Sequence, residues 1–239
     1  MSSESELKIQ EEAIAFAKKN RTRICKEITD KTIYLPEVSP VSVFMSGSPG
    51  AGKTETSKGL VEMITSDGGN VLRLDPDELR GYFSAYDGSN SYLFQRAVTV
   101  LVERSFDNMM KNRQSFILDG TMSNHGVARR NILRSINKGR SVLVIFVYQK
   151  PELAWKFVQA REQTEGRRIL PEHFVDQFFG SQDATNSLKE EFGNKIRIDL
   201  LLKDIDGSTR SYEDNVSNLT SYLNPIYTRE DVLDIVRSV

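Results

Sequence analysis

The chain has little with which to bind zinc or to form a disulfide. It holds one cysteine, Cys25, and two histidines, His125 and His173, among 239 residues. A single cysteine excludes an internal disulfide and fits a reducing compartment, and so few soft ligands argue against a zinc site. We expect Cys25 to serve as a small apolar side chain on an N-terminal helix.

Long apolar runs and an excess of one charge are also missing. No hydrophobic stretch approaches membrane-spanning length, and the polar, acidic residues 1–6 are unlike a signal peptide, so a cytoplasmic protein is expected. Lys and Arg total 32 and Asp and Glu total 33, which leaves a formal charge of −1. Composition therefore gives no argument for a general nucleic-acid or membrane surface.

What the chain does have is one complete GxxxxGK[ST] motif, the phosphate-binding P-loop. The residues before it, 41–46, have the pattern of a buried strand, and residues 55–64 behind it have that of a helix. This strand–loop–helix context is the one that a P-loop requires. The predicted nucleotide-binding residues are Gly47, Ser48, Pro49, Gly50, Ala51, Gly52, Lys53 and Thr54.

The chemistry of a phosphate cradle explains these residue types. The glycines let backbone N–H groups turn toward an anion, and the positive end of the following helix adds its partial charge. Lys53 is placed to reach the β- and γ-phosphates, and the Thr54 hydroxyl to ligate Mg²⁺. The expected cofactor is thus Mg²⁺ with ATP or GTP, and the sequence does not choose between the two nucleotides.

Strand and helix patterns alternate along the rest of the chain. Strands are expected over residues 41–46, 71–74, 115–118 and 142–147, and residues 196–202, 206–207 and 208–212 suggest a late strand and turn. Helices are expected over residues 5–30, 54–65, 92–111, 125–138 and 151–164, with another beginning at Pro171 and two short ones after Tyr212. This order predicts an α/β fold of the P-loop NTPase type, a parallel sheet with helices on both faces. We expect a helical extension over residues 1–39 and a kinase domain over residues 40–239.

Polar side chains follow the predicted strands, where ligands of such sheets gather. Asp75 and Asp77 come after the second strand, and Asp119 and Thr121 after the third. A small-molecule kinase needs a carboxylate beside the acceptor hydroxyl, and Asp77 is our candidate for that base.

A kinase also needs cations that close over the transferring phosphoryl group. The segment 161–168 lies between two predicted helices and carries Arg161, Arg167 and Arg168, of which we assign Arg161 and Arg168 to catalysis. We expect Arg161 on a firm helix and Arg168 on a loop. A solvated charged loop is an equally good interpretation of the same composition.

The P-loop, the Asp-x-Asp-x-Leu-Arg segment over residues 75–80 and the Arg…Arg-x-x-Pro segment ending at Pro171 together resemble the zeta-toxin family of P-loop kinases, over residues 40–210. The resemblance implies phosphorylation of the 3′-hydroxyl of the sugar in UDP-N-acetylglucosamine by a toxin that a small antitoxin protein holds in check. It also implies substrate contacts from Glu103, Asp119 and Thr121. Two positions depart from the family pattern: Asp119 replaces a glutamate, and Ser123 replaces an arginine.

Two other functions stay open at this point. The chain could be a nucleotide-dependent ATPase or binding module whose partner is a protein, with the terminal helices as docking surfaces. It could also transfer a nucleotide rather than a phosphate. The switches that GTPases and motor ATPases need are not identifiable in the sequence.

Overall fold

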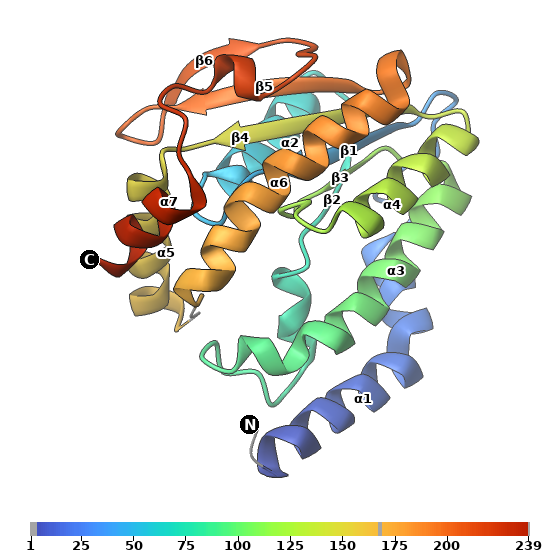
Figure 1. Ribbon diagram of the computed structural model, residues 1–239. Helices are drawn as coiled ribbons and strands as arrows, with labels where there is room; N and C mark the ends of the chain where they lie inside the picture. The colour runs from blue at the N-terminus through green and yellow to red at the C-terminus, as the bar shows by residue number, and fades with distance from the viewer. Residues whose placement is uncertain (1–3, 167–168, 239) are drawn as a thin grey trace.

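The computed structural model describes residues 4–166 and 169–238 (Figure 1). Its strands are β1 Val41–Ser46, β2 Leu72–Leu74, β3 Phe116–Leu118, β4 Ser141–Tyr148, β5 Arg197–Lys203 and β6 Thr209–Glu213. Its α-helices are α1 Glu4–Ile28, α2 Lys53–Ser66, α3 Gln95–Asn112, α4 His125–Asn137, α5 Pro151–Glu165, α6 Pro171–Phe192 and α7 Arg229–Arg237. The predicted alternation of strands and helices is confirmed.

The sheet has six strands in the order β2-β3-β1-β4-β5-β6. Neighbouring strands from β2 to β5 pair in parallel, whereas β6 pairs with β5 in antiparallel. The predicted fold class is confirmed, and β6, which was not predicted, is an antiparallel addition at the edge of the parallel strands. The reason for its direction is the tight turn between β5 and β6, closed by the Asp204 N–H donating to the Ser208 carbonyl at 2.8 Å, because so short a connection joins only antiparallel strands.

Helices cover both faces of the sheet, as predicted. Alternate residues of the strands point to opposite faces, so Phe44 of β1 joins a core cluster with α3, α4 and α6, while its neighbours Val43 and Met45 join a smaller one with α2. In Figure 1, α4 and α6 lie over one face and α2 over the other. The P-loop follows β1 at the centre of this arrangement.

The N-terminal helix does not pack on the sheet. It runs beside α3, the green helix of Figure 1, on the side away from the strands. Cys25 is fully buried in this helix pair, where its thiol donates to the Leu101 carbonyl at 3.3 Å and burial raises its pKa. The expected small buried side chain is confirmed. No helix within the described residues has the length and apolar character needed to cross a bilayer.

Candidate active site

The P-loop turns tightly around two glycines that accept no side chain. Gly47 and Gly50 have φ angles of 135° and 72°. A Cβ at Gly47 would lie 2.2 Å from the Val147 carbonyl oxygen, and a Cβ at Gly50 would lie 2.1 Å from that of Ala154. The loop is thus pressed against β4 and α5, and any residue other than glycine would push it out of shape.

The loop leads directly into α2, which begins at Lys53 after Gly52 in a left-handed conformation. The helix begins slightly earlier than predicted, so its first N–H groups belong to the motif itself. The Lys53 ammonium folds over the loop and donates to the carbonyls of Gly47 and Ser48, at 3.0 and 2.6 Å. Loop amides, helix N-terminus and ammonium together form a site for an anion.

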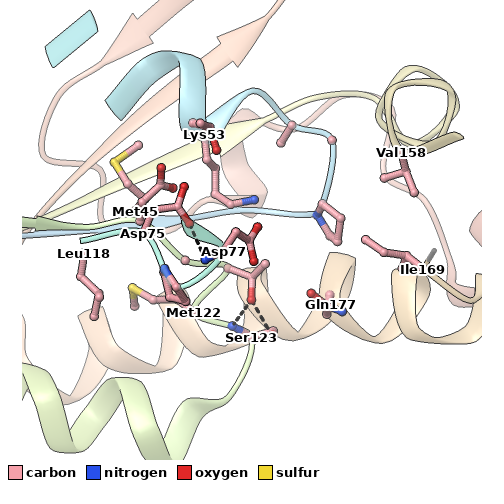
Figure 2. Close-up of a pocket in the computed structure, with 18 of the residues that line it drawn as sticks. Met45, Lys53, Asp75, Asp77, Leu118, Met122, Ser123, Val158, Ile169 and Gln177 are labelled. Carbon is pink, nitrogen blue, oxygen red and sulfur yellow. Dashed lines mark hydrogen bonds between the residues drawn. The ribbon is translucent and has the colours of Figure 1, made fainter. Parts of the chain in front are cut away.

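A cavity of about 1080 Å³ opens beside the P-loop. Its walls come from the loop, the ends of β2 and β3, and the facing sides of α3, α4, α5 and α6. Figure 2 shows Lys53, Asp75 and Asp77 close together at its centre, with Val158 and Ile169 on the opposite side. The cavity is large enough for a nucleotide with a second small molecule beside it.

The two aspartates after β2 have different environments. Asp75 is 7% exposed, and its Oδ1 accepts the backbone N–H of Asp77 at 2.8 Å. Burial raises the pKa of the Asp75 carboxyl, and the nearby charge of Asp77 raises it further. The Asp77 side chain is 33% exposed, lines the cavity and forms an ion pair with buried Arg80. The two carboxyl groups thus differ in exposure and in partners, and the reactive role of Asp77 stays a prediction.

Arg73 of β2 connects the ends of β2 and β3. Its guanidinium donates to Asp75 Oδ2 at 2.5 Å, to Asp119 Oδ2 at 2.6 Å and to Glu78 Oε1 at 2.6 Å. Asp119 Oδ2 also accepts the hydroxyl of Ser57 of α2 at 2.7 Å. The predicted substrate residue Asp119 lines the cavity but is anchored in a network of charges behind it.

Of the three predicted arginines over residues 161–168, the structure describes Arg161. Arg161 lies on α5 and lines the cavity. It also lines a smaller cavity, together with Asp77 and Thr54. The helix ends at Glu165, and Gly166 follows in a left-handed conformation, as expected for the start of a loop. Arg167 and Arg168 lie outside the described residues, so the position of Arg168 stays a prediction.

The remaining predicted substrate residues also line the cavity. The Thr121 hydroxyl lies 3.0 Å from that of Ser123, and Figure 2 shows this hydrogen bond. Glu103 of α3 binds two arginines of α4, with 2.5 Å to Arg130 Nη2 and 3.8 Å to Arg134 Nη1. The cavity therefore brings Thr121, Asp119 and Glu103 together with the P-loop. Their contact with a substrate stays a prediction.

Three residues of this region had no role in the sequence prediction. Arg73 and Arg80 hold the strand-end acids, and Asn131 of α4 lines the cavity while buried. A signal for Asn131 does exist in the sequence. It is a polar residue on the same helix face as Ala128, Ile132 and Ser135, and this face is buried. The contact of Arg73 with Asp119 gives no such signal, because the two residues are 46 positions apart in the chain.

The donor set at the cavity fits Mg²⁺ bound with a nucleotide. Among the described residues, no three His, Cys, Asp or Glu side chains gather closely enough to hold a metal. Mg²⁺ in nucleotide sites takes few protein oxygen atoms and completes its shell with phosphates and water. The Thr54 hydroxyl and the strand-end carboxylates, which all line the same cavity, are ligands of this kind.

Solved structures share this fold. The structure from the PezAT chromosomal toxin–antitoxin system of Streptococcus pneumoniae matches with a TM-score of 0.59 and 17% identity, over 100% of this chain and 90% of that one. The AvrRxo1-ORF1:-ORF2 complex matches with a TM-score of 0.66 and 15% identity, and its form with ATP with 0.65 and 16%, each over 85% of this chain and 70% of the other.

At these identities the likeness shows the fold alone. No curated protein matches the sequence. The family model described as zeta toxin does match, and it covers residues 25–217, well over half of the chain. The protein therefore belongs to the zeta toxin family.

Proposed function

We propose that this protein is a toxin kinase that transfers the γ-phosphoryl group of ATP or GTP to a hydroxyl of a small, nucleotide-activated acceptor. The observation that carries the proposal is the shared cavity, in which the P-loop with Lys53, the acid Asp77 and the α5 arginine Arg161 all take part. Phosphoryl transfer needs these three functions within reach of one another: phosphate binding, an acceptor-side base and cationic stabilisation of the phosphoryl oxygens.

The residues divide the work by their positions. The P-loop amides and the N-terminus of α2 bind the β- and γ-phosphates, and Lys53 exchanges its loop carbonyls for phosphate oxygens. Asp77 accepts the proton of the acceptor hydroxyl, and its ion pair with Arg80 fixes the carboxylate on the cavity wall. Arg161 and Arg168 stabilise the charge on the transferred group.

Mg²⁺ bound with the nucleotide would neutralise part of the charge of the phosphates. Thr54 would supply its hydroxyl as a ligand, and Asp119 and Asp75 would contribute through their carboxylates or through water. The comparison with the AvrRxo1 complex in the presence of ATP supports ATP as the donor.

The acceptor we propose is UDP-N-acetylglucosamine, phosphorylated on the 3′-hydroxyl of its sugar. Family membership supports it, together with the positions of Thr121, Asp119 and Glu103 on the cavity wall. Ser123 supplies a hydroxyl where an arginine would bind phosphate, so the diphosphate must rely on other cations, and Arg130 is placed on the same wall.

We further propose that a small antitoxin protein binds the toxin in the cytoplasm. The solved structures with this fold include parts of a toxin–antitoxin system and of a two-protein complex, which supports such a partner. We place residues 1–39 outside the kinase domain, as an extension that packs on α3.

Mass spectrometry tests the proposal directly. The purified protein is incubated with Mg-ATP or Mg-GTP and UDP-N-acetylglucosamine, and in parallel with a metabolite extract. A sugar nucleotide that gains the mass of one phosphate is the expected product. A product that gains a whole nucleotide would instead establish nucleotidyl transfer, and hydrolysis of the nucleotide without any product would establish an ATPase.

A further inference from the structure

One buried polar group in the cavity has no partner in the protein. Asn131 of α4 is 6% exposed, and its side-chain Oδ1 makes no hydrogen bond within the part of the chain that the structure describes. Buried carboxamides nearly always have partners, because burial removes the water that would otherwise satisfy them. An unsatisfied group that also lines a cavity therefore points to a ligand.

Apolar residues of α3 and α4 line the same cavity as Asn131, and we call this part of the cavity wall the slot. The apolar side chains on its walls include Val102 and Phe106 from α3 and Val127 and Ala128 from α4. Phe106 is held in place by edge-on packing against Phe116, and the Arg134 guanidinium lies 4.6 Å from its ring centre. A slot with rigid apolar walls and one carboxamide suits a flat or compact group with polar atoms on one edge.

We infer that the Asn131 side chain forms hydrogen bonds with an amide edge of the acceptor, that is, an N–H next to a C=O. This part of the acceptor enters the slot between α3 and α4. A carboxamide offers one acceptor and two donors, so it pairs with a partner that presents a donor beside an acceptor. Asn131 is then a specificity residue for the kinase, an assignment that rests on the proposed function because it takes this cavity as the acceptor site.

A nucleotide sugar has two groups with this chemistry. Uracil presents its ring N3–H beside carbonyl oxygens, and the N-acetyl group of the sugar presents its own N–H and C=O. Glu103 and Arg130 form an ion pair and line the same cavity. Two simple probes separate the two sources: UDP-glucose has the uracil alone, and N-acetylglucosamine 1-phosphate has the N-acetyl group alone.

The decisive variant is Asn131→Leu, which keeps the size of the side chain and removes its polar atoms. Calorimetric titration of the full-length protein with each probe measures affinity without any turnover. We expect affinity for one probe to fall roughly tenfold or more, because its hydrogen bonds to the carboxamide are lost. We also expect Tm to rise by about 2–4 °C, because the variant no longer buries an unsatisfied group.

The rise in Tm separates ligand recognition from a structural role, since a structural asparagine would lower Tm when replaced. Asn137→Leu is the matched control: it makes the same change on the exposed side of α4, outside the cavity, and should leave affinity unchanged. A fall for UDP-glucose alone assigns the slot to uracil, and a fall for N-acetylglucosamine 1-phosphate alone assigns it to the N-acetyl group.

Equal effects on both probes, a lower Tm in Asn131→Leu, or failure of the wild-type protein to bind either probe would overturn the inference. The proposed function fails separately, through the absence of phosphate transfer by a wild-type protein that nonetheless binds a probe.

Discussion

Arg73 of β2 holds Asp119, the acid at the end of the adjacent strand β3, with 2.6 Å between Nη2 and Oδ2. In the parallel register Arg73 lies opposite Ile117, so its guanidinium extends past the end of β3 to the aspartate. The Asp119 side chain is one methylene shorter than the glutamate that members of the family usually carry at this position. The contact with Arg73 fixes the shorter carboxylate at the edge of the cavity.

Removing Arg73 should destabilise the protein. Arg73→Met leaves Asp75 and Asp119, 7% and 5% exposed, without their counter-charge, and breaking a buried pair in this way costs about 3–5 kcal/mol. Arg129→Met is the control, because it breaks an exposed pair with Glu191, worth about 0–1 kcal/mol. Urea denaturation gives both free energies of unfolding. Equal effects in the two variants would show that the Arg73 network does not contribute to stability.

Lys53→Ala should abolish phosphate transfer without unfolding the protein. The Lys53 ammonium donates to carbonyls of the loop and lines the cavity rather than the core, so its removal should leave the fold intact. The transfer rate and the thermal melt are measured together, with Lys111→Ala, an exposed lysine of α3 outside the cavity, as control. Near-normal transfer by folded Lys53→Ala would remove the P-loop from the mechanism.

The two strand-end aspartates should respond differently to the same change. Asp77→Asn keeps the shape and removes the proton acceptor, so transfer should fall by ~10²–10⁴ while nucleotide affinity is kept. Asp75→Asn weakens the contact with Arg73 and should mainly lower the stability. Turnover, nucleotide affinity and urea midpoints are measured for both. If Asp75→Asn loses turnover and Asp77→Asn does not, the base is Asp75.

Most of the fold follows from local pattern, and what does not follow depends on distant partners. The strand predicted over residues 41–46 is β1 itself, because six apolar or small residues between turns allow little else. The antiparallel strand β6 was not predicted, because the sequence suggested only one late strand and a turn over residues 196–212. The division into residues 1–39 and 40–239 stays a prediction.

The same distinction applies to the site. The spacing of its glycines and lysine identified the P-loop, and position after a strand identified Asp77 and Asp119. The link from Arg73 to Asp119 is invisible to such arguments, since only the folded sheet brings these two residues together. Arg80 lies three residues from its partner Asp77 and entered the sequence analysis only as part of the segment over residues 75–80. Both side chains are buried, with exposed fractions of 9% for Arg73 and 6% for Arg80, and this burial is a property of the fold.

Arg161 and Arg168 should affect turnover more than nucleotide binding. Arg161→Ala and Arg168→Ala should each lower kcat by as much as ~10³–10⁵, because a cation on the phosphoryl oxygens acts mainly in the transition state. Arg167→Ala, which we expect to face solvent, serves as control and should have a mild effect. Single-turnover rates and nucleotide Kd values are compared. A loss of nucleotide affinity with kcat unchanged would place Arg161 in ground-state binding instead.

Expression in bacteria should slow growth or lyse the cells. Phosphorylation of a sugar nucleotide at the 3′-hydroxyl would divert it from cell-wall synthesis, so toxicity should depend on catalysis and be relieved by Lys53→Ala. Growth curves of cells that express the two proteins at equal levels, checked by immunoblot, make this comparison. The Lys111→Ala variant should stay as toxic as the wild type. A protein that phosphorylates its acceptor in vitro and yet proves harmless would contradict the role of toxin. The kinase would then have a housekeeping or detoxifying role. In that case the cell would use the phosphorylated product and would not be harmed by loss of the substrate.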